Sequence, residues 1–113
     1  MSQEVWFAAS LLFERTFNNG PVAPALYEET IILVRAQGDD ETTALKKAMK
    51  LGKAASHSYK NADGETVNWT FKEVLRVTQL FDTEIAEGSE VYSRFLNAME
   101  VEGLRASLAS PVT

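Results

Sequence analysis

The chain has 113 residues, of which 45% are hydrophobic and 24% charged, so it fits one globular domain spanning residues 1–113. Its net charge of −5 argues against a general nucleic-acid-binding protein, and the absence of cysteine excludes disulfides, zinc fingers and thiol catalysis. No apolar run reaches the roughly 20 residues of a membrane helix, and no basic region precedes the first apolar run. We therefore expect a cytoplasmic protein with no membrane partner.

The first half of the chain predicts two strands followed by a helix. Residues 5–17 and 27–36 are apolar on both faces, as interior strands are, and turn residues from Asn18 to Pro21 follow the first of them. A helix from about Asp40 to Lys53 follows, because Asp39 or Asp40 can cap its N-terminus. Its periodicity predicts that three residues face the sheet: Leu45, Ala48 and Met49.

The second half opens with a strong hairpin signal. Asn61 to Gly64 fits a type I turn closed by a left-handed glycine, which predicts Tyr59 opposite Val67 and His57 opposite Trp69.

Residues 67–81 then alternate as a return strand. Uninterrupted alternation would place Glu73 on the apolar side, where a carboxylate needs a partner or a raised pKa. A bulge near Lys72 would instead turn Glu73 to solvent and Val74 inward.

The C-terminal part is less regular. The spacing of apolar residues in 90–96 fits both a helix and a strand, and their β-branched and aromatic content favours a strand. A short helix is expected at about 102–108. The resulting order, β-β-α-β-β-β-α, predicts an α+β fold: an antiparallel sheet of four to five strands with one main helix packed on a face. The second face needs cover from the C-terminal helix or from another subunit, so a homodimer is one expectation.

Four segments together resemble a known family: Trp6–Glu14, Leu26–Glu29, Asn61–Glu65 and Glu90–Arg94. They are similar to domain-of-unknown-function family 4288, over nearly the whole chain. The resemblance implies a compact single domain from a bacterium or phage. It implies no activity, cofactor or catalytic residue.

Two ligand sites can be built from the charged and aromatic residues. If the first two strands pair around their loop, Glu14 falls near Glu28 or Glu29, and with Glu73 and an arginine they could bind a cation or act as an acid–base pair. Alternatively, these carboxylates have no functional role and are either solvated at the strand ends or paired with arginines. A second site would stack a ligand on Trp69 and Tyr92, with Arg76 or Arg94 holding an anion.

Two surfaces are candidates for protein contacts. One is the face of the first strand formed by the alternate residues that include Trp6 and Leu12. These side chains could equally be buried within the monomer. The other is the lysine face of the helix, Lys46, Lys50 and Lys53, which could meet phosphate or an acidic protein. The alternative for the lysines is a solvated face with cations near the negative helix end.

The sequence favours a small binding or regulatory module that acts through protein contacts, of the immunity, inhibitor or defence type. The alternatives are a small-ligand-binding domain for a nucleotide or another anion, and a carboxylate-based hydrolase or isomerase. No phosphate loop or dinucleotide motif is present, and the single histidine, His57, lies in the hairpin with neighbouring serines on the opposite face. We therefore predict no catalytic residue, no cofactor and no metal, with nucleic acid an unfavoured partner.

Overall fold

The computed structural model describes residues 3–18, 26–82 and 84–109, and it places the side chains of these residues up to 106. The order of elements is β-β-α-β-β-α, which confirms the α+β class with one main helix packed on an antiparallel sheet. The elements are β1 (Glu4–Phe17), β2 (Leu26–Gln37), α1 (Glu41–Ala55), β3 (His57–Lys60), β4 (Thr66–Gln79) and α2 (Ala98–Ala109). Most of the predicted turn at Asn18–Pro21 lies outside the described residues.

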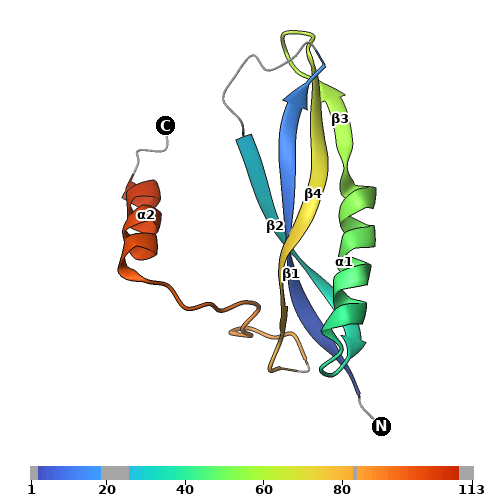
Figure 1. Cartoon of the computed structure of the whole chain (residues 1–113), viewed down its shortest axis with the longest axis vertical. Helices are drawn as coiled ribbons and strands as arrows, with labels where there is room; N and C mark the ends of the chain where they lie inside the picture. Colours follow the sequence, from blue (N-terminus) through green and yellow to red (C-terminus); the bar gives the residue numbers. More distant parts are fainter. Residues whose placement is uncertain (1–2, 19–25, 83, 110–113) are drawn as a thin grey trace.

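The four strands form one sheet in the order β2-β1-β4-β3, with every neighbouring pair antiparallel (Figure 1). The predicted hairpin is confirmed, since Tyr59 pairs with Val67 and His57 pairs with Trp69. Gly64 closes its turn at a φ of 77°, a left-handed conformation that glycine adopts without steric cost. In the strand order given above, β1, the first strand of the chain, lies in the interior of the sheet.

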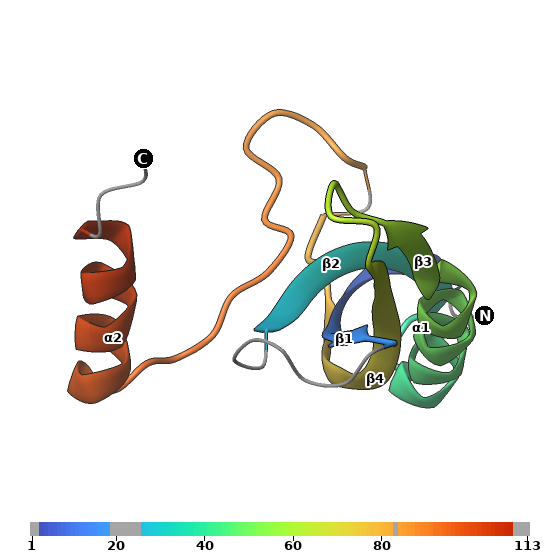
Figure 2. The same ribbon diagram turned by 90° about the horizontal axis from the view of Figure 1, so that it is seen from above.

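One face of the sheet is covered by α1, and this face forms the hydrophobic core (Figure 2). Alternate residues of β1 point into it and are almost fully buried, among them Phe7 and Leu11. We call the opposite side the open face. Its central β1 residues, Ala8 and Ser10, are also buried, because their small side chains lie between larger neighbours on β2 and β4.

The helix α1 begins where the sequence predicts. The carboxylate of Asp40 accepts a hydrogen bond from the Thr43 backbone N–H at 3.0 Å and another from the Thr43 hydroxyl at 2.7 Å. The residues that α1 buries are small: Ala44, Ala48 and Gly52. The prediction that Leu45 and Met49 face the sheet is only partly right, because both are more than one third exposed at the flanks of the contact.

The Asp40 cap should make the stability of the protein depend on acid pH. The pKa of Asp40 is lowered, because the Thr43 hydroxyl and backbone N–H both donate to its charged form. A lowered pKa stabilises the fold above the ordinary value of 3.8, and this contribution is lost as the pH falls through the lowered value. Asp40→Asn retains a capping oxygen that does not titrate. Below about pH 4, the melting temperature followed by circular dichroism should therefore fall more steeply for the wild type than for Asp40→Asn. Parallel acid profiles of the two proteins would contradict this role.

Two β-bulges interrupt β4. Phe13 pairs with Phe71 and Leu12 pairs with Glu73, so Lys72 is left between two register pairs. The same happens at Leu75, which lies between the partners of Leu11 and Ser10. The structure thus contains the bulge at Lys72 that the sequence analysis weighed, with Glu73 exposed and Val74 packed against the core.

The region after β4 differs from the prediction. Residues 90–96 form no strand, and the terminal helix α2 starts at Ala98 rather than near residue 102. Within the described residues, α2 contacts neither the strands nor α1, and Figure 2 shows it standing away from the sheet at the end of an extended segment. The fifth strand and the closing role of the helix were therefore wrong. No helix in the described part of the chain is long and apolar enough to cross a membrane.

Candidate functional site

A groove runs along the junction of α1 with the edge strand β2, and we call it the α1–β2 groove. It consists of two adjoining hollows of about 470 and 340 Å³, and both have Leu33 and Leu51 in their walls. The larger hollow adds apolar surface from Trp6, Val34 and Ala54. Core residues including Phe13 and Ile32 line the smaller hollow. The walls of both hollows are therefore mainly apolar.

Positive charge gathers at the larger hollow. The Arg35 guanidinium lies over the Trp6 ring, 4.9 Å from its centroid, and Lys47 Nζ donates to the Arg35 carbonyl oxygen at 2.6 Å. Lys50 lines the same hollow. The smaller hollow is instead lined by Glu28. The groove is thus basic at one end and acidic at the other, in a chain whose net charge is −5.

The outer edge of β2 presents backbone groups that no described strand pairs with. The Trp6 carbonyl accepts a hydrogen bond from Leu80 N–H at 2.9 Å, so the backbone of Trp6 points towards β4 and away from β2. Backbone groups alternate in direction along an antiparallel strand. Arg35, which lies opposite Trp6, therefore points its N–H and C=O outwards, and so does every second residue of β2: Tyr27, Glu29, Ile31, Leu33 and Gln37.

The two edges of the sheet differ in how they are protected. The β3 edge has four residues, His57 to Lys60, all of them exposed. The β2 edge has twelve residues and exposes Leu26, Tyr27 and Ile31 to about half of their surface. A short, polar edge strand discourages pairing with another chain, whereas a long apolar one is a template for it.

The register separates Glu28 from the predicted carboxylate cluster and leaves Glu14, Glu29 and Glu73 on the open face. Glu14 lies opposite Tyr27 rather than opposite a glutamate, and Glu28 lies on the other face of the sheet from Glu14. Glu29 accepts a hydrogen bond from the Ser10 hydroxyl. Glu73 is exposed. Within residues 3–18, 26–82 and 84–109, no three side chains of the metal-binding kind come together.

Glu14 has structural partners of its own. The Tyr27 hydroxyl donates to Glu14 at 3.1 Å, and Lys72 Nζ lies 3.5 Å from its other oxygen. The pKa of Tyr27 is raised, because its protonated form donates to the carboxylate and the negative charge opposes ionisation. These contacts tie β1 to β2 and β4 on the open face.

The predicted aromatic site is also divided. Trp69 packs against the core on the α1 side of the sheet. Tyr92 lies on the open face, where the Arg76 guanidinium sits 5.4 Å from its ring centroid. Arg94 is exposed on the extended segment before α2. A single ligand therefore cannot stack on both Trp69 and Tyr92.

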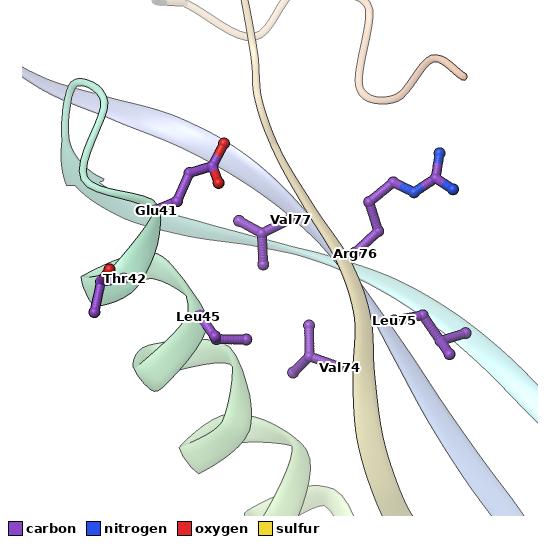
Figure 3. Close-up of a pocket in the computed structure, with 7 residues that line it drawn as sticks. All are labelled: Glu41, Thr42, Leu45, Val74, Leu75, Arg76 and Val77. Atoms are coloured by element: carbon purple, nitrogen blue, oxygen red, sulfur yellow. The ribbon is translucent and has the colours of Figure 1, made fainter. Parts of the chain in front are cut away.

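Figure 3 shows a third hollow, between the start of α1 and β4. Leu45, Val74 and Val77 converge on it from the two elements, whereas Arg76 points to the opposite side of β4. The groups that meet there are mainly apolar, with Glu41 at the rim. Although Arg76 is part of the lining, its guanidinium is directed away from the converging side chains, which does not favour an anionic ligand there.

His57 does not form a catalytic arrangement. Its Nδ1 lies 3.1 Å from the Ala55 carbonyl oxygen, and its ring stacks against Tyr59. The Ser58 hydroxyl donates to Asn68, and the Ser56 hydroxyl accepts a bond from a β4 backbone N–H. Both serines are engaged in structural hydrogen bonds: Ser58 joins β3 to β4, and Ser56 joins the C-terminal end of α1 to β4.

The predicted protein-contact residues separate into two groups. Trp6 and Lys50 line the same hollow of the α1–β2 groove, so the structure unites one residue from each predicted surface. Leu12 lies on the open face, where it pairs with Glu29. Lys46 and Lys53 are exposed on α1 and line neither hollow of the groove.

A family model matches residues 6–93, and its description is a domain of unknown function, DUF4288. The chain belongs to this family. The resemblance inferred from the sequence is thereby confirmed. The DUF4288 match includes β1 from Trp6 onwards, the other three strands and α1, and hence the whole α1–β2 groove, while α2 lies beyond it. No curated protein and no solved structure matches the chain.

Two cationic residues of the groove, Arg35 and Lys47, were not among the residues singled out from the sequence. The signal that could have found them is β2 itself, which is apolar on both faces yet carries two glutamates near its start and an arginine near its end. Its place at the edge depends on pairing between distant strands.

Proposed function

We propose that the protein is a protein-binding module that takes an extended segment of a partner along the outer edge of β2. The observation that carries this proposal is the outward row of β2 backbone groups beside the α1–β2 groove. In such β-strand addition, main-chain hydrogen bonds provide affinity, and pockets for alternate side chains provide specificity. Both components lie side by side here.

The residues that line the groove indicate which side chains the bound segment of the partner should carry. Apolar walls at Leu33 and Leu51 favour aliphatic or aromatic side chains on one face of the incoming strand. The cations Arg35, Lys47 and Lys50 favour a carboxylate near one of its ends. The segment that fits is therefore acidic and apolar, although the chain as a whole is acidic.

The other functions considered from the sequence have less support. A small-ligand site lacks its aromatic sandwich, because Trp69 and Tyr92 belong to opposite faces of the sheet. A hydrolase or isomerase has less support, because Glu14 is engaged by Tyr27 and Lys72, and Glu29 accepts a hydrogen bond from the Ser10 hydroxyl. We further propose that the protein comes from a bacterium and is located in the cytoplasm. The bacterial source rests on the family resemblance.

The test is selection from a random peptide library displayed on phage, followed by affinity measurements with the peptides obtained. We expect strand-forming peptides that combine apolar residues with Asp or Glu. Ile31→Pro should weaken their binding by about tenfold or more, because it removes an outward N–H from the middle of the edge. The fold should persist, because that N–H takes no part in pairing with β1.

A matched proline control exists on the opposite edge. Asn61 N–H donates to the Glu65 carbonyl at 2.9 Å, so the alternation of β3 directs the Ser58 N–H outwards. Ser58→Pro therefore removes an equivalent N–H from the β3 edge and should leave peptide affinity unchanged. Equal affinity of the wild type and Ile31→Pro for the selected peptides would contradict the proposal.

A further inference from the structure

The edge strand β2 itself has the composition that its own groove would bind. Two carboxylates, Glu28 and Glu29, lie near its start, and the apolar run from Ile31 to Leu33 lies at its centre. Arg35 lies near its end, where Lys47 contacts it from α1. An antiparallel copy of the strand would bring the acidic end of each chain to the basic end of the other.

The directions of the backbone groups allow this pairing. A two-fold axis perpendicular to the sheet, passing midway between the Ile32 residues of the two copies, places Ile31 of one copy opposite Leu33 of the other. Both residues point their N–H and C=O groups outwards, so they form a hydrogen-bonded pair in each half. Ile32 then lies opposite its own symmetry mate on the α1 side, which extends the core across the junction.

Charges select this register from the alternatives. In it, Glu29 lies opposite Arg35 of the second copy on the open face, and the symmetry repeats the pair. On the α1 side, Glu28 lies opposite Ala36 of the second copy, next to the position of Lys47. A shift by two residues would place Glu29 opposite Leu33 and lose both pairs, while a shift by one would turn the apolar set to the wrong face.

We propose that a second copy of this chain occupies the β2 edge, joining two four-stranded sheets into one continuous antiparallel sheet with both α1 helices on the same side. This inference rests on the proposed function, because it assigns an occupant to the same edge. The Lys47 bond to the Arg35 carbonyl is compatible with it, since a carbonyl oxygen has a second lone pair for the incoming N–H. Self-pairing and the binding of a foreign strand then exclude each other, so the dimer covers the edge until a partner displaces it.

A charge-reversal experiment with mixing tests both the surface and the register. By sedimentation velocity, the wild type should have twice the 12.5 kDa mass of the chain. Arg35→Glu makes two glutamates face each other at each end of the junction, and Glu29→Arg makes two arginines face each other there. Each variant alone should raise the dimer dissociation constant by about tenfold or more, because like charges face each other twice.

An equimolar mixture of the two variants should recover the dimer. In the mixed dimer, each of the two charge pairs again consists of one glutamate and one arginine. One pair keeps the original order, with glutamate at position 29 and arginine at position 35, and the other pair has the two residues exchanged. A foreign partner would not produce this rescue. Lys60→Glu, which makes the same charge change on the β3 edge, should remain as dimeric as the wild type.

Folding of each variant is verified by circular dichroism, because Glu29→Arg also removes the bond from Ser10. Ile31→Pro gives a second route, since it should be a folded monomer without any change of charge. A wild-type monomer, a dimer that persists in both charge variants, or folded variants that stay monomeric when mixed would each overturn the inference. Peptides that bind a wild-type monomer and lose affinity in Ile31→Pro would overturn the dimer alone and leave the proposed function standing.

Discussion

Phe7→Ala should lower the free energy of unfolding by about 3–5 kcal/mol, as truncation of a buried phenylalanine does in other cores. Phe7 has no exposed surface and belongs to the central strand β1, between Val34 of β2 and Gln79 of β4. The cavity cannot easily collapse, because hydrogen bonds to strands on both sides hold the β1 backbone. Urea unfolding followed by circular dichroism measures the loss.

The matched control is Phe95→Ala. Phe95 has a fully exposed side chain on the extended segment before α2, so the same truncation removes no buried contact. Its effect should remain within about 0.5 kcal/mol of zero. Similar losses from the two variants would mean that the hydrophobic core is not where the structure places it.

Gly52→Leu should be the second severe change. A Cβ atom at Gly52 would lie 2.4 Å from Cε1 of the Phe71 ring, closer than side chains can approach. That ring is itself held edge-on against Phe13, with the two centroids 5.9 Å apart. Separation of α1 from the sheet should cost about 1–3 kcal/mol or more, which exceeds the gain of about 1 kcal/mol in helix propensity. Thermal unfolding measures the difference.

Two controls accompany this substitution. Gly103→Leu in α2 introduces the same side chain where no atom lies within 4 Å, so the melting temperature should not fall. Gly52→Leu combined with Phe71→Ala should cost less than the sum of the two single changes, because the truncated ring makes room for the leucine. Additive losses would show that contact with Phe71 is not the cause.

Local chemistry explains what the sequence predicts correctly. The hairpin around Gly64 and the start of α1 at Asp40 depend on hydrogen bonds within a few residues, so they can be inferred without the rest of the fold. Even the bulge at Lys72 could be formulated as an alternative. An unbroken strand would have directed Glu73 towards the core, and the cost of burying its charge made a second conformation worth considering.

Features that depend on distant pairing were harder to predict. Val91 and Phe95 have strand-forming side chains, but no strand in the described part of the chain pairs with their segment, which stays extended and leaves α2 apart from the sheet. The two apolar faces of β2 indicated an interior strand, yet β2 lies at an edge. For the same reason Trp6 and Lys50 were found as separate surfaces, while Arg35 and Lys47 between them were missed.

The interior position of β1 also determines the order in which the sheet can be built. β1 can form a hairpin with β2 early, but its other neighbour is β4, and the pairing of Phe7 with Gln79 closes a loop of roughly seventy residues. During synthesis, β1 therefore exists with one side unpaired until most of the chain has emerged from the ribosome. A fold with so many non-local contacts is expected to form slowly, and its nascent hairpin exposes apolar side chains on both faces to chaperones and to aggregation.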